Sequence, residues 1–464
     1  MRIYNTLSKT KEEFVPVEPG QVKIYACGPT VYNYFHVGNA RTFLFFDIVR
    51  TYLTYKGYQV KYIQNLTDID DKLIQQSIDE DLPVNVIAEK YIEGFFTDIE
   101  ALGLRKADDY PRATEYIIEM IELIRKLEKE GFAYNVNGDV YFSVASFNGY
   151  GKLSGKNLEE LKAGARVEEN PDKKHHADFT LWKSAKPGEP SWDSPWGKGR
   201  PGWHTECVVM SQKLLGDSID IHCGAVDLIF PHHENEIAQA EAITGRQFVK
   251  YWMHGGFLNI SGEKMSKSLQ NFFLTRDILQ KYDAEALRFF FLSKHYRSTI
   301  DFSEELIKEA DRAVKSLYQA LNEVDYSAFK NEKVTIPEEM EEFRQKFENA
   351  MEDDFNTAKA IAVIFELAKL TKINFLKTRD NYKASAFLLV ELGSILGFFS
   401  NLDEKLATNL NDLSGKLIDL LLSCRTRLKQ EKNWQLADLI RDDLNELGIQ
   451  IKDTAEGTIW RLNR

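Results

Sequence analysis

Two segments that lie far apart in the chain carry side chains suited to work on a nucleoside triphosphate. Lys264-Met265-Ser266-Lys267-Ser268 places two cations and two hydroxyl donors in a short loop, where they could neutralise charge developing on departing pyrophosphate. His36-Val37-Gly38-Asn39 stands at the start of a helix predicted over 38–56. Helix N-termini favour phosphate oxygens, because their first N–H groups point outward and the macrodipole is positive there. The first segment alone could equally be a solvated surface loop, but the pair together indicates ATP chemistry.

A second set of residues could hold a metal ion. His232 and Glu236 are four residues apart, so on a helix they share one face. Cys27 and Cys207, from two other segments, would complete a set of two thiolates, one imidazole and one carboxylate. No C-x-x-C occurs, which excludes a compact zinc finger. Spacing alone favours the plainer interpretation, in which both cysteines are small buried hydrophobes.

The first hundred residues contain the elements that would position these groups. Val22–Ala26 is predicted as a strand ending at a turn, the helix over 38–56 follows, and Val60–Gln64 is predicted as the next strand. Such a unit is a right-handed crossover, and ligands bind beyond the carboxyl ends of its strands. Cys27 and Asn65–Asp68 fall at those ends, so the ligand site is expected there.

The rest of the chain changes character twice. Residues 112–200 are predicted as an insertion, with a helix over 113–130 and a hairpin turning at Asn137-Gly138. The stretch 186–202 is expected to be irregular, and its G-x-G-x-x-G match (197–202) is discarded because no strand was expected before it and no helix within it. After residue 283 the pattern is all-α. The predicted helices include 304–324, 337–351 and 357–376, and a small region follows from 411 to 464.

Composition is that of an ordinary globular protein, with 43% apolar and 28% charged residues among 464. Four cysteines are too few for a disulfide framework, and no run approaches the ~18 apolar residues that span a bilayer. We therefore expect a cytoplasmic protein with reduced thiols and no membrane partner. The net charge of −12 is weak evidence against a nucleic-acid partner, because RNA binding depends on local basic surface.

The ATP-directed segments resemble the two signature motifs of the class I aminoacyl-tRNA synthetases. Within that class, the chain resembles the cysteinyl-tRNA synthetase family over essentially its whole length. The resemblance is carried by segments 25–32, 65–72, 201–207, 230–236, 432–438 and 457–460. Two departures stand out: Asn39 occupies a position where the class often has a second histidine, and His222–Asp227 replaces the usual glycine run.

The resemblance implies an α/β fold: a Rossmann-like parallel-sheet catalytic domain with an insertion, then an all-α helical bundle and a small C-terminal anticodon-binding domain. The implied divisions are 1–111 and 201–250 for the two halves of the catalytic domain, 112–200 for the connective insertion, 251–303 for the KMSKS and stem-contact region, 304–400 for the bundle and 401–464 for the anticodon-binding domain.

It also implies the reaction and its residues. L-cysteine would be activated by ATP with Mg²⁺ as cysteinyl-adenylate and passed to tRNA(Cys), with one Zn²⁺ selecting the substrate thiolate. The implied zinc ligands are Cys27, Cys207, His232 and Glu236. The implied ATP-binding residues are His36, Gly38, Asn39, Lys264, Met265, Ser266, Lys267 and Ser268, of which His36, Asn39, Lys264 and Lys267 would be catalytic. The implied amino-acid pocket is Thr67, Trp203 and Asp227.

Several local interpretations remain open. Cys223 could be an inert packed thiol, which we favour, or could compete for the metal. His204 and His222 are expected to be neutral pocket histidines, and His233 is expected to point away from the metal. Trp434 and Trp460, with Arg441, would contact the anticodon or, for the tryptophans, belong to the core of a small domain. A monomer is expected.

Two other functions compete with the first. A related ligase could join activated cysteine to an amino-sugar acceptor, and a catalytically silent relative could bind zinc and RNA. The intact α-helical tail and the complete motifs favour the tRNA-charging enzyme.

Overall fold

The computed structural model describes residues 1–157, 171–260, 262–264, 272–377, 381–454 and 457–462. The chain forms two compact units, Met1–Leu317 with Lys333–Ser400 and Tyr318–Glu332 with Asn401–Arg464. Of the pentapeptide that begins at Lys264, residues 265–268 lie outside the described residues, and Lys264 is described through its backbone in a short strand.

A four-stranded parallel sheet organises the first unit, in the order β10-β9-β3-β4. Its strands are β3 (Gln21–Ala26), β4 (Gln59–Gln64), β9 (Ile219–Ala225) and β10 (Val249–Gly255). The predicted strand, helix and strand are confirmed as β3, α1 (Val37–Tyr55) and β4. Because the chain leaves β3 toward β4 on one side and β9 pairs on its other side, the strand order reverses between β3 and β9. That is where open α/β sheets bind ligands.

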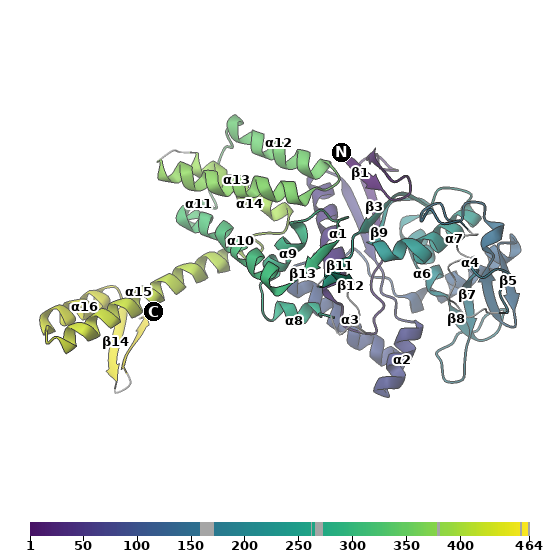
Figure 1. Cartoon of the computed structure of the whole chain (residues 1–464), viewed down its shortest axis with the longest axis horizontal. Coiled ribbons are helices and arrows are strands. Elements are labelled where there is room, and N and C mark those ends of the chain that lie inside the picture. Colours follow the sequence, from purple (N-terminus) through teal and green to yellow (C-terminus); the bar gives the residue numbers. More distant parts are fainter. Residues whose placement is uncertain (158–170, 261, 265–271, 378–380, 455–456, 463–464) are drawn as a thin grey trace. The chain divides into compact units, whose positions relative to one another are not determined.

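Helix α1 is buried along most of its length and packs on β4, β9 and β10 (Figure 1). A run of apolar residues through Phe43, Leu44 and Ile48 supplies the buried surface. The chain leaves the helix through Gly57, whose φ of 88° is a left-handed conformation that glycine adopts without a steric penalty. Because α1 follows the carboxyl end of β3 in the chain, the helix begins at the carboxyl edge of the sheet, which is the edge that carries the candidate site.

The insertion is an antiparallel sheet in the order β5-β6-β7-β8, covered by helix α4 (Ile117–Lys129). Its strands are β5 (Ala133–Val136), β6 (Asp139–Phe142), β7 (Phe179–Ser184) and β8 (Gly199–Pro201). The predicted hairpin is confirmed: Asn137 and Gly138 both have positive φ, 56° and 96°, as a two-residue turn of this kind requires.

The stretch 186–202 is not wholly irregular, as the sequence had suggested. It contains β8, and helix α6 (Trp203–Leu215) begins directly after Gly202. Gly199 explains part of the glycine pattern, because a Cβ there would lie 2.3 Å from Trp182 Nε1 and 2.4 Å from the Lys183 carbonyl oxygen. The absence of a side chain at Gly199 thus permits β8 to lie against β7. This glycine of the G-x-G-x-x-G match therefore has a packing role.

Figure 1 shows α6 and α7 (Glu234–Thr244) beside the central sheet, toward the insertion. The other elements up to residue 302 are β1 (Arg2–Asn5), β2 (Thr10–Glu13), α2 (Asp71–Glu80), α3 (Val84–Ala101), β11 (Leu258–Ile260), β12 (Glu263–Lys264), α8 (Thr275–Leu279), α9 (Ala284–Leu292) and β13 (Ile300–Phe302). Short helical turns cover Ala113–Tyr116 and Val144–Ser146.

The predicted helices after residue 303 are confirmed to within one residue at their ends. They are α10 (Glu304–Glu323), α12 (Glu338–Glu352) and α13 (Thr357–Leu376), with α11 (Tyr326–Phe329) and α14 (Tyr382–Ile395) in addition. Helices α12, α13 and α14 pack on one another. No helix among the described residues is long and apolar enough to cross a membrane.

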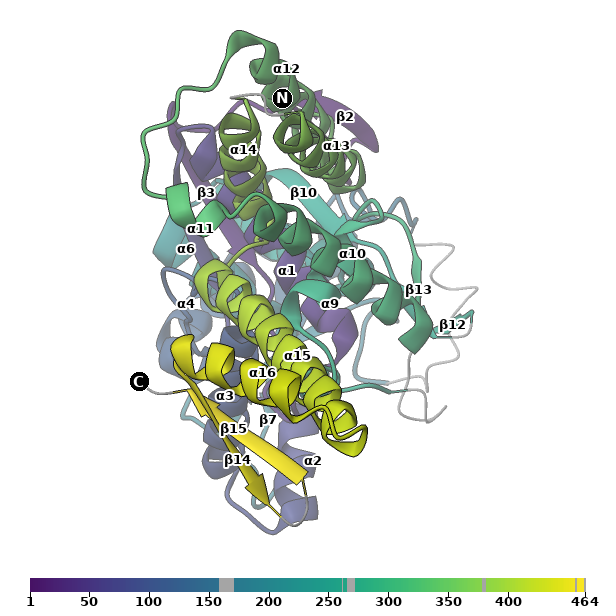
Figure 2. The ribbon, with the colours of Figure 1, turned by 90° about the vertical axis from the view of Figure 1, so that its left-hand side faces the viewer.

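The second unit contains α15 (Leu402–Gln430), α16 (Trp434–Glu446) and a hairpin of β14 (Ile449–Thr454) and β15 (Gly457–Leu462). Figure 2 shows α15, α16 and the hairpin side by side. Its core holds Ile418, Leu422 and Leu444, and Trp460 packs against that core, whereas Trp434 is 58% exposed. The two tryptophans therefore have different roles: Trp460 contributes to the core and Trp434 is available at the surface.

Candidate metal centre and active site

The four residues that the sequence analysis assigned to zinc lie together and are buried. Cys27 follows the carboxyl end of β3, Cys207 lies on α6, His232 lies in the segment Ile229–His233 that leads into α7, and Glu236 lies on the first turn of α7. One ligand atom from each falls within 4.8 Å of the others. Segments distant in sequence thus converge at the edge of the sheet where the strand order reverses.

The distances that involve the Cys207 sulfur match a tetrahedral zinc site. A tetrahedron with zinc–ligand bonds of about 2.0 to 2.3 Å has edges of roughly 3.8 Å between two sulfurs and roughly 3.3 to 3.6 Å between other pairs. Cys27 Sγ and Cys207 Sγ are 3.8 Å apart, and Cys207 Sγ is 3.6 Å from His232 Nε2. Glu236 Oε1 lies 3.0 Å from His232 Nε2, shorter than such an edge, and 3.9 Å from Cys27 Sγ, longer than one. The donor set and the sulfur distances therefore fit zinc, and a small shift of the Glu236 carboxylate would complete the tetrahedron.

Burial keeps these groups neutral in the absence of a cation. It raises the pKa of the Cys27 thiol and of the Glu236 carboxyl well above their usual values, and it lowers the pKa of His232 well below the usual value for histidine. A divalent cation supplies the positive charge that the ionised thiolates and carboxylate need. Metal binding at this group is therefore coupled to proton release.

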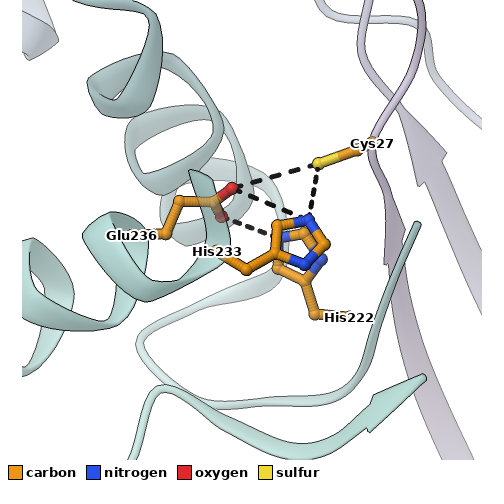
Figure 3. Close-up of side chains that lie close together, drawn as sticks. All are labelled: Cys27, His222, His233 and Glu236. Carbon is orange, nitrogen blue, oxygen red and sulfur yellow. Dashed lines mark hydrogen bonds and ion pairs between the residues drawn. The ribbon is translucent and has the colours of Figure 1, made fainter. Parts of the chain in front are cut away.

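Three further histidines surround the group, and His233 lies elsewhere than expected. The sequence analysis predicted that His233 points away from the metal, but its Nε2 lies 3.2 Å from Cys27 Sγ (Figure 3). The physical reason is helical spacing: His232 and His233 lie four and three residues before Glu236, and residues at both spacings share one face of a helix, so both rings lie toward Glu236. His222 Nε2 contacts Glu236 Oε2 at 2.7 Å, and His204 Nδ1 contacts His232 Nδ1 at 2.9 Å.

His204 and His222 are neutral, as expected, because burial lowers the pKa of each to about 3. Sequence reasoning placed these two histidines in the pocket but did not foresee that His233 would join them. One signal was available, since five of the nine histidines fall between residues 204 and 254.

A second combination, Cys27 with His222, His233 and Glu236, also lies within 4.8 Å (Figure 3). Its geometry differs from the first. The 2.7 Å from His222 to Glu236 and the 3.2 Å from His233 to Cys27 are hydrogen-bond lengths, and this combination leaves out Cys207, whose sulfur lies at tetrahedral distances from Cys27 and His232. The distances thus fit His222 and His233 as donors to metal ligands better than as ligands themselves.

Cys223 lies outside both combinations, in agreement with the interpretation as a packed thiol. Its Sγ is 3.6 Å from the Tyr25 carbonyl oxygen. The neighbouring Gly224 permits a close approach, because a Cβ there would lie 2.8 Å from Leu228 Cδ1 and 3.0 Å from His233 Cε1. The segment His222–Asp227 replaces the usual glycine run but keeps Gly224, and this one glycine leaves room for the His233 ring against β9.

The three residues expected in the amino-acid pocket follow the ends of the site's strands or border the metal group. Thr67 is buried after β4, and its hydroxyl donates to Glu206 Oε2 at 2.9 Å. Trp203 is 38% exposed and stacks on His232, with ring centroids 4.1 Å apart. Asp227 is exposed in the 3₁₀ turn Val226–Leu228 that follows β9. Glu206 was not foreseen; it is buried, and its Oε1 has no partner among the described residues.

The predicted phosphate-binding residues form the N-terminal cap of α1. The backbone N–H groups of Gly38 and Asn39 donate to His36 Nδ1 at 3.1 and 3.2 Å, and the backbone N–H of His36 donates to Asn39 Oδ1 at 3.3 Å. Because Nδ1 accepts these bonds, the hydrogen of a neutral His36 ring is on Nε2. Asn39 therefore completes a capping box at the position where a second histidine is common.

Comparison with known proteins assigns the class first. Residues 13–312 match the family described as the tRNA synthetases class I (C) catalytic domain, and residues 346–400 match the DALR domain. Solved synthetases share the fold. They include the Agrobacterium radiobacter K84 agnB2 LeuRS (TM-score 0.61, 12% identity, 85% of this chain and 86% of that one) and the Mycobacterium tuberculosis methionyl-tRNA synthetase (TM-score 0.57, 14% identity, 87% and 94%). The fold and the catalytic-domain match define a class I tRNA synthetase.

The particular family follows from a full-length relative. The chain is 50% identical over 468 residues to the cysteine–tRNA ligase of Clostridioides difficile (strain 630), covering 99% of this chain and all of the relative. The chain belongs to the cysteine–tRNA ligase family of class I synthetases.

Proposed function

We propose that this protein attaches L-cysteine to tRNA(Cys), using ATP with Mg²⁺ and forming cysteinyl-adenylate on the way. The observation that carries the proposal is the buried group of Cys27, Cys207, His232 and Glu236, whose spacing fits zinc. Zinc, when bound, supplies a soft Lewis-acidic centre that prefers a thiolate to a hydroxyl group. An apolar pocket separates close isosteres such as cysteine and serine by only about 1 to 3 kcal/mol, so this group accounts for selection without a proofreading domain.

The residues of the chain would then position the reaction. Thr67, Trp203 and Asp227 shape the pocket around the substrate amino and side-chain groups. The N-terminus of α1 and the Nε2–H of His36 face the phosphates of ATP. The substrate carboxylate attacks the α-phosphorus in line and pyrophosphate leaves, with Lys264 and Lys267 neutralising the developing charge. The terminal ribose hydroxyl of the tRNA then attacks the adenylate carbonyl and releases AMP.

The helices after α9 and the second unit would bind tRNA(Cys). The DALR match at 346–400 supports a tRNA acceptor, whereas an amino-sugar acceptor would leave these regions without a role. Trp434, which is exposed, is our candidate for stacking on an anticodon base, with Arg441 beside it on α16. We further propose a cytoplasmic monomer, and the domain divisions given by the sequence analysis.

Cysteine-dependent ATP–pyrophosphate exchange tests the activity directly. We expect exchange with cysteine and none with serine, loss after zinc is removed by a chelator, and recovery when zinc is added back. Charging of tRNA transcripts then identifies the acceptor. Absence of exchange with zinc-loaded protein would contradict the enzyme assignment, and exchange that persists without zinc would contradict the zinc assignment alone.

Two substitutions of His36 separate its two roles. His36→Ala removes both the cap acceptor and the imidazole, so we expect it to lower the free energy of unfolding by about 1 kcal/mol and exchange by ~10²-fold. His36→Asn retains a cap acceptor, so we expect near-normal stability with the same loss of exchange. Denaturant unfolding and exchange kinetics measure the two effects. Full activity in His36→Asn would restrict His36 to capping.

A further inference from the structure

The proposed zinc centre carries more negative than positive charge. Cys27, Cys207 and Glu236 are each anionic as metal ligands, so with a divalent cation the centre has a net charge of −1, and a substrate thiolate would make it −2. All the ligands are buried. Excess charge at low dielectric is costly unless hydrogen-bond donors are directed at the charged atoms. The centre therefore requires donors to its sulfur and oxygen atoms.

A line of three side chains ends at one of those sulfurs. Thr6, which follows β1, has its Oγ1 2.8 Å from His254 Nδ1, and His254 lies on β10. His254 Nε2 lies 2.8 Å from His233 Nδ1. His233 Nε2 in turn lies 3.2 Å from Cys27 Sγ, as Figure 3 shows. Three elements of the first unit thus contribute to one continuous hydrogen-bonded chain.

The direction of this chain follows from the chemistry of its ends. A neutral imidazole has one N–H and one acceptor nitrogen, so all three bonds must run the same way. A thiolate can only accept, so with Cys27 ionised His233 Nε2 carries a hydrogen and donates it. His233 Nδ1 then accepts from His254 Nε2–H, and His254 Nδ1 accepts from the hydroxyl of Thr6. The Cys27 thiolate thus sets the direction, and the Thr6 hydroxyl supplies the donor that satisfies His254 Nδ1.

We propose that Thr6 and His254 are positioning residues that hold the Nε2–H of His233 on the metal-bound sulfur of Cys27. The inference rests on the proposed zinc site. His233 would then donate a hydrogen bond to the ligand Cys27, as His222 does to the ligand Glu236 at 2.7 Å. Such outer contacts raise metal affinity and fix ligand orientation. Gly224 supports the arrangement, because its missing Cβ leaves room for the His233 ring against β9.

Zinc affinity of the full-length protein tests the proposal without reference to catalysis. In competition with a chromophoric chelator, we expect His254→Phe to weaken zinc binding by about 10- to 100-fold. Thr6→Val should weaken it by a smaller factor, because the rings remain and only the donor to His254 Nδ1 is lost. Thr6→Ser is the matched control, which keeps the hydroxyl and should bind zinc as the wild type does.

A spectroscopic signature distinguishes this role from simple packing. With cobalt(II) in place of zinc, the sulfur-to-metal charge-transfer band should move to lower energy in Thr6→Val and His254→Phe, because a thiolate that loses a donor holds its electrons less tightly. X-ray absorption should find two sulfur ligands in the wild type and in both variants. If His254→Phe does not fold, the zinc affinity and the cobalt band of Thr6→Val, compared with those of Thr6→Ser, test the proposal.

Two results would overturn the proposal while leaving the enzyme assignment intact. One is wild-type zinc affinity and an unshifted cobalt band in Thr6→Val. The other is a single sulfur ligand in the wild type, which would make His222 and His233 direct ligands together with Cys27 and Glu236. Failure of the wild-type protein to bind zinc in a one-to-one ratio would instead overturn the zinc part of the proposed function.

Discussion

Replacing Cys207 with alanine should abolish stoichiometric zinc binding and reduce cysteine-dependent exchange by at least ~10³-fold. Structural zinc sites of four ligands contribute about 10 to 16 kcal/mol, so one ligand is worth several kcal/mol, and each 1.4 kcal/mol is a factor of ten. Cys207 is only 1% exposed, and its Sγ is 3.8 Å from that of Cys27, so protein atoms enclose the position of this ligand and solvent does not reach it. Zinc content after gel filtration and exchange kinetics measure the two effects.

Cys223→Ala is the matched control for this substitution. Cys223 is also fully buried and lies on β9 of the central sheet, but its sulfur contacts the Tyr25 carbonyl oxygen and belongs to neither metal-ligand combination. We expect this variant to retain full zinc content and exchange, apart from a modest loss of stability from the smaller side chain. Zinc loss of equal size in both variants would indicate a general packing effect and contradict the assignment of Cys207 as a ligand.

The elements of this fold could be predicted from local patterns, because their signals are local. Strand β3, helix α1 and strand β4 follow from apolar periodicity, and the hairpin of β5 and β6 follows from Asn137-Gly138, which supplies two positive φ values. Strand β8 escaped prediction because its three residues form a strand only through pairing with β7. A pairing partner distant in sequence leaves no periodic signal in so short a segment.

The candidate metal group shows the same division between local and tertiary information. Only His232 and Glu236 are neighbours in sequence, and spacing by itself favoured buried, unliganded cysteines. The resemblance to a known family brought Cys27 and Cys207 to the same site, and the structure places all four together. The prediction for His233 was wrong because it considered only that His233 adjoins His232, whereas His233 also lies three residues before Glu236 and so shares a helix face with that carboxylate.

A second large effect is expected at Asp354, far from the chemistry. Its side chain is fully buried and accepts hydrogen bonds from the backbone N–H of Tyr4, the hydroxyl of Tyr296 and the guanidinium of Arg297, at 2.9, 2.9 and 2.7 Å. This carboxylate links the N-terminal strand β1, the segment before β13 and the end of α12. Asp354→Asn should lower the free energy of unfolding by about 3 kcal/mol, because it leaves a partly buried guanidinium without its counter-charge.

Asparagine is the informative replacement, because Asp354 has a φ of 63° and asparagine tolerates that left-handed conformation. The neighbouring Asp353 supplies the control. Its carboxylate pairs with Lys11 at 2.6 Å but is 45% exposed, so Asp353→Asn should cost less than about 1 kcal/mol. Guanidinium unfolding of the three proteins at pH 7 measures the difference. Equal losses in the two variants would contradict the role given to the buried carboxylate.

The difference in unfolding free energy between the wild type and Asp354→Asn depends on pH, and its direction follows from the pKa of Asp354. Burial alone would raise the pKa of Asp354, but the bonds from His295 and the Tyr4 amide, with the charge of Arg297, outweigh it and hold that pKa below the usual value. A lowered pKa in the folded state means that the stabilisation is fully present above the unfolded value of about 3.9 and is lost as pH falls through the folded value. The gap between the wild type and Asp354→Asn should therefore narrow below pH ~4. A gap that does not change down to pH 3 would show that shape, and not charge, makes Asp354 stabilising.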